Sequence, residues 1–487
     1  MVVLLALFLS FGWRAQDPPS GQWLRDRPNM TEQAPPLGTL PRERQSIPEL
    51  HLQTKVRYFS AGLAAAESSF AFAFPSSDCS GPIPTGYTRI FIAYRSDSKS
   101  GTGSAADPFD GSTAQRFDTL LRTRSENDVT NLVVCIGPGT FETEGEHDYV
   151  IGVGHLNKAQ PAGFTVNQGW RVHGAGMDRT ILKLADLYLD SSTGGYLVGR
   201  IITTHDLDSQ SVEVSHLTLD DNYPALKQRY KTALQLEAVV LRSARGGHWI
   251  HNIHVMNASG ETTEAFPVEI SSQARSQESS GNVVEYVTMD HWGSGKCTAI
   301  AIDNAIAEVR YNTVVGYQVA YGGWKMSGVR FHDNYAIQTP YGFNIDSLQN
   351  SGVVISHNQI VHPLSYGMVI GGIGQFSNFL ISGNTITMAS PAPWSTLYGL
   401  IFQGNVTGAQ VTGNKIISDH SPPRGSILGL FEKGNHNTGN VVQGNQISSA
   451  FKHSLQGADC VYDNVNEAGA ALRGLNNTQA TACEPRP

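Results

Sequence analysis

An asparagine recurs between short alternating apolar segments in the second half of the chain. The segments "VVISHNQIVHP", "FLISGNTITMA" and "AQVTGNKIISD" share the frame apolar-x-x-Asn-x-apolar. The asparagines are spaced by 22, 24, 26, 30 and 31 residues and are Asn312, Asn334, Asn358, Asn384, Asn414 and Asn445. A period of roughly 20 to 50 residues indicates a solenoid, and apolar alternation predicts strands. Stacked coil on coil, these residues would form a ladder of hydrogen-bonded amides, and asparagine also tolerates the left-handed backbone of a tight turn.

A second recurring frame predicts a third strand in each coil. It reads "TALQLE" from Thr232, "FPVEIS" from Phe266, "TAIAID" from Thr298, "YQVAYG" from Tyr317 and "YGFNID" from Tyr341. Its third and fifth positions are apolar and are predicted to face inward, with the fourth and sixth facing outward. The outward positions therefore include Glu237, Ser271, Asp303, Gly322 and Asp346 at the sixth place and Gln235, Glu269, Ala301, Ala320 and Asn344 at the fourth.

Three strands per coil predict an all-β fold, a single-stranded right-handed parallel β-helix. Upstream, Phe117, Leu120 and Leu121 have helical spacing after Ser112 or Thr113, which predicts a capping helix over residues 112–124. We expect residues 1–75 to be a signal peptide and disordered extension, residues 76–455 to be the β-helix domain, and residues 456–487 to be an irregular tail. Tyr341, Tyr366 and Tyr398 recur at strand starts, and we expect a stacked structural column rather than a sugar platform.

Composition excludes some partners and favours export. The net charge of -8 gives no basic bias toward nucleic acid, and the apolar start "MVVLLALFLSFGW" has the length of a signal-peptide core and is too short to span a membrane. We therefore expect a secreted, periplasmic or cell-surface monomer without a membrane span. None of the five cysteines has CxxC spacing, so a zinc or redox motif is unsupported. Cys460 and Cys483 either form a bridge or are independent small apolar residues.

The opening of the predicted solenoid resembles that of the pectin-lyase-like right-handed β-helix proteins. The similarity lies in "SGTGSAADPFDGS", "NLVVCIGPGTFET" and "GWRVHGAGMDRTILKL", and it extends over roughly residues 90 to 455. In addition, "TMDHWGSGKCTAIAID" resembles the "DH…DGLID" run of pectate lyases. The resemblance implies a polysaccharide substrate bound along a groove. The chain has neither an "RxPxxR"-like segment nor the "NTD", "GDD", "GHG" and "RIK" pattern of polygalacturonases.

The leading functional interpretation is a polysaccharide lyase that acts on an acidic glycan. In the resembled lyases, calcium neutralises the uronate carboxylate and a basic residue removes the C5 proton. The expected calcium ligands are Asp303, Glu269 and Glu237, because hard oxygen ligands suit Ca²⁺. The expected base is Lys296 or His291, with Asp290 beside it. Glu237, Asn344, Lys325 and Arg245 are the expected substrate-binding residues.

Two alternatives remain open at this stage. Asp303 and Asp346 face the same way with one coil between them, about 9.6 Å apart by strand spacing, which suits an inverting glycoside hydrolase. Asp290 with Asp303 is a second possible pair. Alternatively, the protein only binds glycans, as an adhesin does, and its outward carboxylates are ordinary solvent-facing residues. His216, His251 and His357 lie inside strand frames, where packing is the expected role.

Overall fold

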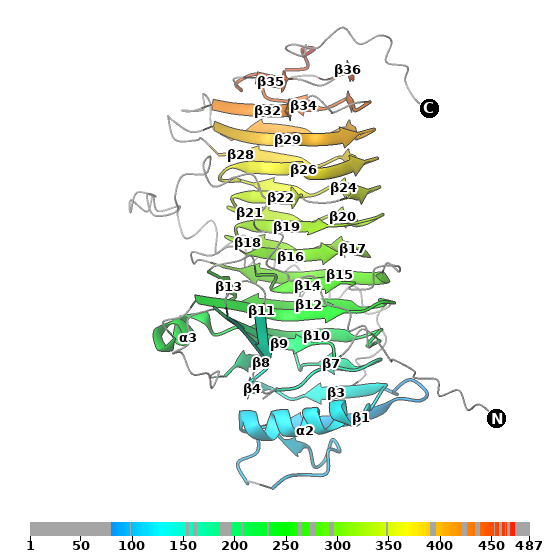
Figure 1. Ribbon diagram of the computed structural model, residues 1–487, viewed down its shortest axis with the longest axis vertical. Helices are drawn as coiled ribbons and strands as arrows, with labels where there is room; N and C mark the ends of the chain where they lie inside the picture. Colours follow the sequence, from blue (N-terminus) through cyan, green and yellow to red (C-terminus); the bar gives the residue numbers. More distant parts are fainter. Residues whose placement is uncertain are drawn as a thin grey trace, which may run out of the picture.

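The computed structural model shows one elongated column of stacked strands (Figure 1). It describes residues 79–472, except for 98, 152–154, 159–162, 186–195, 206–207, 231–232, 262–264, 273–278, 292–296, 347–348, 390–395, 420–425, 434–438, 452, 457–459, 463 and 465–467. Within this part no helix is long and apolar enough to cross a membrane.

Most coils contribute three parallel strands, as the sequence predicts, and the strands form three stacks. The first two stacks join into a 22-stranded sheet, and the third lies in a 14-stranded sheet. The first stack contains β1 (Thr88–Ala93), β2 (Phe109–Asp110), β3 (Leu132–Ile136), β7 (Arg171–His173), β17 (Ala305–Arg310), β20 (Arg330–His332), β24 (Val354–Ser356), β27 (Leu380–Ser382), β30 (Gln410–Thr412), β33 (Val441–Gln443) and β36 (Cys460–Tyr462).

The second stack contains β4 (Gly139–Thr143), β8 (Thr180–Leu184), β18 (Thr313–Val315), β21 (Tyr335–Ile337), β25 (Gln359–Val361), β28 (Thr385–Met388), β31 (Lys415–Ser418) and β34 (Gln446–Ile447). Three long strands run through both stacks: β10 (Glu213–Asp220), β12 (Trp249–Met256) and β15 (Ser279–Asp290).

The third stack contains β9 (Tyr196–Thr203), β11 (Ala233–Arg242), β14 (Val268–Ser271), β16 (Thr298–Asp303), β19 (Val319–Trp324), β22 (Tyr341–Ile345), β26 (Tyr366–Ser377), β29 (Thr396–Thr407), β32 (Ser426–Lys433) and β35 (His453–Gln456). Short additions to this sheet are β5 (Glu146–Ile151), β6 (His155–Lys158), β13 (Ser259–Gly260) and β23 (Asn350–Ser351). The solenoid continues past residue 455, because β36 pairs with β33.

The predicted asparagine ladder is present between the first two stacks. The Nδ2 of Asn334 donates to Oδ1 of Asn358 at 2.9 Å, and the Nδ2 of Asn358 donates to Oδ1 of Asn384 at 2.9 Å. The same contact joins Asn312 to Asn334, Asn384 to Asn414, Asn414 to Asn445 and Asn445 to Asn464. Each Nδ2 also donates to a main-chain carbonyl, as Asn358 does to Phe331 at 3.0 Å. The buried amides are therefore hydrogen-bonded on both sides.

The left-handed turn residue is the one before each ladder asparagine, which corrects the prediction that asparagine itself takes this conformation. Tyr311, Asp333 and His357 have φ values of 56°, 56° and 55°, and glycine fills the equivalent place before Asn384, Asn414 and Asn445. Earlier coils keep this turn without the asparagine. There His216 has a φ of 57°, and the next residue, Leu217, is buried and apolar. The left-handed turn therefore forms whether or not an asparagine side chain follows it.

The predicted inward and outward alternation of the third stack is confirmed, but its register was wrong in two coils. Val319 pairs with Thr298, and so Trp324, rather than Gly322, lies opposite Asp303. The cause is Tyr317, which is buried in the corner before the strand and is not part of it.

The second register error concerns β11. Arg242, rather than Glu237, lies opposite Ser271, and neither Gln235 nor Ala320 has the predicted alignment. Eight consecutive residues of β11 are buried, and a strand buried on both faces gives no alternation to fix its register.

The N-terminal end of the column is covered by helix α2 (Ala114–Glu126), which confirms the predicted cap (Figure 1). Thr113 is the N-cap and accepts a hydrogen bond from the main-chain N–H of Arg116. Phe117 and Leu121 are fully buried against the first coils. A second helix, α3 (Tyr223–Arg229), projects from the side of the column. The cap shields an apolar end that would otherwise face water.

A disulfide joins Cys79 to Cys135 on β3, a pairing that the sequence analysis did not predict. Cys297 is buried and is not part of a disulfide. The expected Cys460–Cys483 bridge lies outside the residues whose side chains are described. Such a bond is typical of proteins that fold in an oxidising compartment.

The tyrosine column is confirmed as a stack. The rings of Tyr341 and Tyr366, and of Tyr366 and Tyr398, lie 5.1 Å apart at interplanar angles of 14° and 12°. The two faces of the central ring are therefore occupied by its neighbours, which supports a structural role.

Candidate functional site

The candidate site is a column of side chains on the outward face of the third stack. Arg242 pairs with Ser271, Ser271 pairs with Asp303, and Asp303 pairs with Trp324. Asp346 directly follows Ile345, which pairs with Gly323, and it therefore takes the next place in the column. Asp303 and Asp346 thus face the same way with one coil between them, as predicted.

Most of this face is buried, which corrects the interpretation of its carboxylates as solvent-facing residues. Glu269 is 6% exposed, Asp346 is 7% exposed and Glu237 is 1% exposed. Because a buried carboxylate is costly unless it is paired or protonated, these side chains need partners or protons.

Asp303 and Glu269 form an acidic pair in which burial raises the pKa of both carboxyl groups. Burial and the charge of Glu269 together raise the pKa of Asp303 to about 7, whereas Lys325, Trp324 and Arg242 oppose the shift. Burial also raises the pKa of Glu269, against the nearby charge of Arg242. The Arg242 guanidinium lies 4.0 Å from the Glu269 carboxylate. Within the described part of the chain, Oδ1 of Asp303 is buried without a hydrogen bond.

Glu237 is engaged by another set of partners. Its carboxylate accepts hydrogen bonds from Arg200 on β9 and from Gln235, each at 2.8 Å. Arg200 also lies 3.3 Å from Glu146 on β5. Glu237 is therefore part of a buried ion pair and not a free ligand.

The residues present do not fit the expected calcium ion. Among the described residues, no group of three or more His, Cys, Asp or Glu side chains is arranged to hold a metal. Glu237 is neutralised by Arg200, and Arg242 lies beside Glu269. The calcium ligand set Asp303, Glu269 and Glu237 stays a prediction that this geometry does not support.

The other expected catalytic residues lie elsewhere or outside the described part. Asp290, at the end of β15, contacts His254 at 2.9 Å. The ring of His291 is buried 5.1 Å from that of Tyr317. Lys296 is outside the described residues. Asp290 thus ends a strand of the second stack and His291 follows it, whereas Asp303 ends a strand of the third stack.

Of the predicted substrate-binding residues, Asn344 and Lys325 lie near the two aspartates, and Arg245 lies in a turn. Asn344 lies in the Glu269 column, two coils past Ala301, and donates to Asp346 at 3.1 Å. Lys325 has a left-handed φ of 52° directly after Trp324 and acts electrostatically on Asp303. Arg245 is exposed in the turn after β11, where its carbonyl accepts from Ser280.

Three residues of this region were missed by sequence reasoning. They are Arg242, Trp324 and Phe266, and the rings of Phe266 and Trp324 lie 4.9 Å apart beside the acidic pair. The correct register of β11 and β19 would have aligned Arg242 and Trp324 with Asp303. Phe266 precedes its strand, and its contact depends on the fold of the third stack.

Comparisons with known proteins agree with this architecture. Neither a protein-family model nor a curated protein matches the sequence. Among solved structures, the chain is similar to the A-module of a mannuronan C-5 epimerase from Azotobacter vinelandii, with 14% identity and a TM-score of 0.41, over 75% of this chain and 93% of that one. It is also similar to an exopolygalacturonase from Thermotoga maritima, with 10% identity and a TM-score of 0.39, over 66% and 88% of the two chains. This chain is a right-handed parallel β-helix.

A third similar structure is the tailspike protein of E. coli bacteriophage HK620 in complex with a pentasaccharide. The identity is 14% and the TM-score is 0.42, over 72% of this chain and 67% of that one. Identities this low concern architecture alone, so the chemistry of this β-helix must be argued from its own side chains.

Proposed function

We propose that this β-helix is a glycoside hydrolase in which Asp303 is the general acid and Asp346 the general base. The observation that carries the proposal is the pKa of Asp303, which burial raises to about 7. A carboxyl group with such a pKa keeps its proton near neutral pH and can deliver it to a leaving glycosidic oxygen.

The separation of the two aspartates supports an inverting mechanism. Two strand spacings place Asp303 and Asp346 about 9.6 Å apart, at the wide edge of the range of about 6.5–9.5 Å that admits a water molecule beside the sugar. Asn344 donates a hydrogen bond to Asp346 and orients its carboxylate. Asp346 would then activate the water while Asp303 protonates the leaving group.

Aromatic and cationic side chains next to Asp303 supply the means of holding a sugar. Trp324 lies between the two aspartates in the column, and its ring is 4.9 Å from that of Phe266. Lys325 and Arg242 bring positive charge close to Asp303. Apolar ring faces suit the C–H face of a pyranose, and the two cations suit a glycan that carries carboxylates.

The proposal is tested by incubating the protein with neutral and acidic oligosaccharides and following both new reducing ends and absorbance of unsaturated products. We expect reducing ends with inverted anomeric configuration by NMR. Asp303→Asn and Asp346→Asn should each lower the rate by about 10²- to 10⁴-fold while glycan binding persists. Asp178→Asn, which alters an exposed carboxylate in an early loop, should leave the rate unchanged.

Each other result has a distinct meaning. Unsaturated products would show that the protein is a lyase, as expected from the sequence, and not a hydrolase. Retained anomeric configuration would exclude the inverting pair. Glycan binding that never yields a product, and that neither substitution weakens, would show a binding protein without catalysis.

A further inference from the structure

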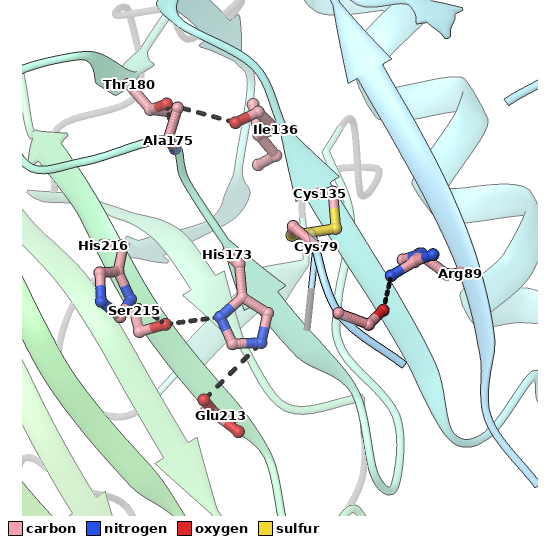
Figure 2. The surroundings of a disulfide bond; sticks show 11 residues. Cys79, Arg89, Cys135, Ile136, His173, Ala175, Thr180, Glu213, Ser215 and His216 are labelled. Carbon is pink, nitrogen blue, oxygen red and sulfur yellow. Dashed lines mark hydrogen bonds and ion pairs between the residues drawn. A yellow bond between two sulfur atoms is a disulfide. The ribbon is translucent and has the colours of Figure 1, made fainter. Parts of the chain in front are cut away.

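A second cluster of titratable side chains lies far from the candidate site, on the outward face of the first stack beside the disulfide (Figure 2). The cluster contains the carboxylate of Glu213 on β10. Its Oε1 lies 3.0 Å from Nε2 of His251 on β12 and 3.6 Å from Nε2 of His173 on β7. Two histidines from neighbouring coils therefore converge on one carboxylate.

The remaining contacts close these residues into a ring. His173 Nδ1 lies 2.7 Å from Ser215 Oγ, and Ser215 Oγ lies 2.9 Å from His216 Nδ1. Asn252 completes the ring, because its Nδ2 lies 3.5 Å from His216 Nε2 and 3.1 Å from His251 Nδ1. We call Glu213, His173, Ser215, His216, Asn252 and His251 the histidine ring.

One assignment of protons satisfies every contact in the histidine ring. The Asn252 amide donates to His216 Nε2 and to His251 Nδ1, which makes both nitrogens acceptors. His216 Nδ1–H then donates to Ser215, and the Ser215 hydroxyl donates to His173 Nδ1. The Nε2–H groups of His173 and His251 are left facing Glu213. All three imidazoles are neutral in this arrangement, and a proton added at Nε2 of His216 would face the N–H groups of the Asn252 amide.

Four members of the histidine ring are buried, whereas His216 and Asn252 are partly exposed. Ser215 is 0% exposed, His251 is 3%, His173 is 5% and Glu213 is 9%. A serine with no exposed surface cannot attack an external substrate, so the cluster does not serve as a second hydrolytic site. A buried polar network instead fixes the local packing of the coils that carry it.

The surrounding elements contribute both signs of charge. Arg171 on β7 lies 3.6 Å from Glu213, and its guanidinium lies 4.8 Å from the centre of the Tyr87 ring. On the other side, Trp249 stacks on His251 at 3.8 Å and donates to Glu285 of β15 at 3.0 Å. Arg310 of β17 donates to Glu285 at 2.7 Å and neutralises it. From β3 comes Cys135, which is in the disulfide and carries no charge.

We propose that the histidine ring is an acid-sensitive lock: protonation of His216 opens it and loosens the early coils, from β7 to β12, while the coils joined by the asparagine ladder remain folded. The ladder residues do not titrate, whereas the early coils have apolar residues in the ladder position. Because each coil of a solenoid contacts only its neighbours, a local loss of stability need not spread through the column.

The direction of the effect follows from His216. Burial and the charges of His251 and His173 together lower its pKa from 6.5 to about 4, against the charge of Glu213. The unfolded chain therefore takes up a proton that the folded chain refuses between pH 6.5 and 4, so stability is full above pH 6.5 and falls as the pH drops to 4. Burial by itself would raise the pKa of Glu213, but His251, His173 and Arg171 hold it below its usual value, and this stability too is lost in acid.

The test compares urea unfolding of the wild type and His216→Asn from pH 4 to pH 8. Asparagine is neutral at every pH and tolerates the left-handed backbone, which has a φ of 57° at this position. The variant should take up about one proton fewer on unfolding between pH 6.5 and 4, so its midpoint should fall less steeply. His357→Asn is the matched control, because His357 occupies the equivalent turn with a φ of 55° but is exposed. His357→Asn should titrate like the wild type.

Measurements on the unaltered protein keep the proposal falsifiable if His216→Asn fails to fold. Hydrogen–deuterium exchange at the imidazole C2 carbon, followed by mass spectrometry, should show His216 titrating well below its ordinary pKa. Brief proteolysis near pH 4.5 should first cut within residues 171–256. Ordinary titration of His216, equal slopes for wild type and His216→Asn, or first cuts within residues 312–464 would each overturn the proposal.

Discussion

At the residue scale, the environment of Asp303 decides what its carboxyl group can do. The sequence places it on an outward face, but its burial and its pKa of about 7 depend on neighbours from three other coils. Glu237 shows the opposite outcome, since Arg200 on the adjacent strand fixes its carboxylate in an ion pair. Glu237 and Asp303 were both predicted as calcium ligands, but Glu237 is held in an ion pair with Arg200 and the pKa of Asp303 is raised.

The pH dependence of hydrolysis should report the protonation of Asp303. A general acid works only while it carries its proton, and burial raises the pKa of Asp303 to about 7. We expect kcat to fall about tenfold per pH unit above this value. The measurement is a pH profile of kcat for the wild type, with Glu308→Gln, a change on the first stack, as control. A profile that is flat from pH 6 to pH 9 would contradict the role of Asp303.

At the element scale, strand identity was predictable from the sequence but strand register was not always so. Alternation located the inward residues of β14, β16 and β22, since each has one apolar face. It failed at β11, which is buried on both faces, and at β19, where Tyr317 fills a corner. These two failures are why Arg242 and Trp324 were missing from the predicted site. The histidine ring was missed as well, because its members belong to three strands and meet only in the folded protein.

The disulfide ties the N-terminal segment to β3, and its removal should weaken that end of the column. The bond joins residues 56 positions apart, and its reduction releases this loop in the unfolded chain. We expect reduction to lower the free energy of unfolding by about 2–4 kcal/mol. The measurement is urea unfolding with and without a reductant. Cys297→Ala should respond to the reductant like the wild type, and Cys79→Ser with Cys135→Ser should not respond. Equal midpoints for the oxidised and reduced wild type would contradict the prediction.

At the scale of the whole molecule, the asparagine ladder runs through most of the column. The fold was predictable because this ladder repeats at solenoid spacing, and every predicted ladder residue is present. A substitution at one rung should be costly. Asn358→Ala leaves the main-chain N–H and the amide of Asn334 without an acceptor and removes the donor to Asn384. We expect a loss of about 3–5 kcal/mol in urea unfolding.

The neighbouring residue provides the control for this rung. Gln359 is exposed, and its side chain donates to the Tyr335 hydroxyl at 2.8 Å. Gln359→Ala should change the free energy of unfolding by no more than about 0.5 kcal/mol. Equal losses from Asn358→Ala and Gln359→Ala would show that the ladder amides contribute no more than surface contacts.

The ladder also has a direction, because each amide gives its hydrogen to the next coil and accepts one from the coil before. The Nδ2 of any ladder asparagine can therefore donate to the Oδ1 of any other that is placed in the next coil. Deleting residues 334–357, one whole period, would bring Asn312 opposite Asn358 with donor facing acceptor, whereas changing a single rung interrupts the line. The gain or loss of a complete coil therefore preserves the hydrogen-bonded ladder, whereas a substitution of one ladder asparagine interrupts it.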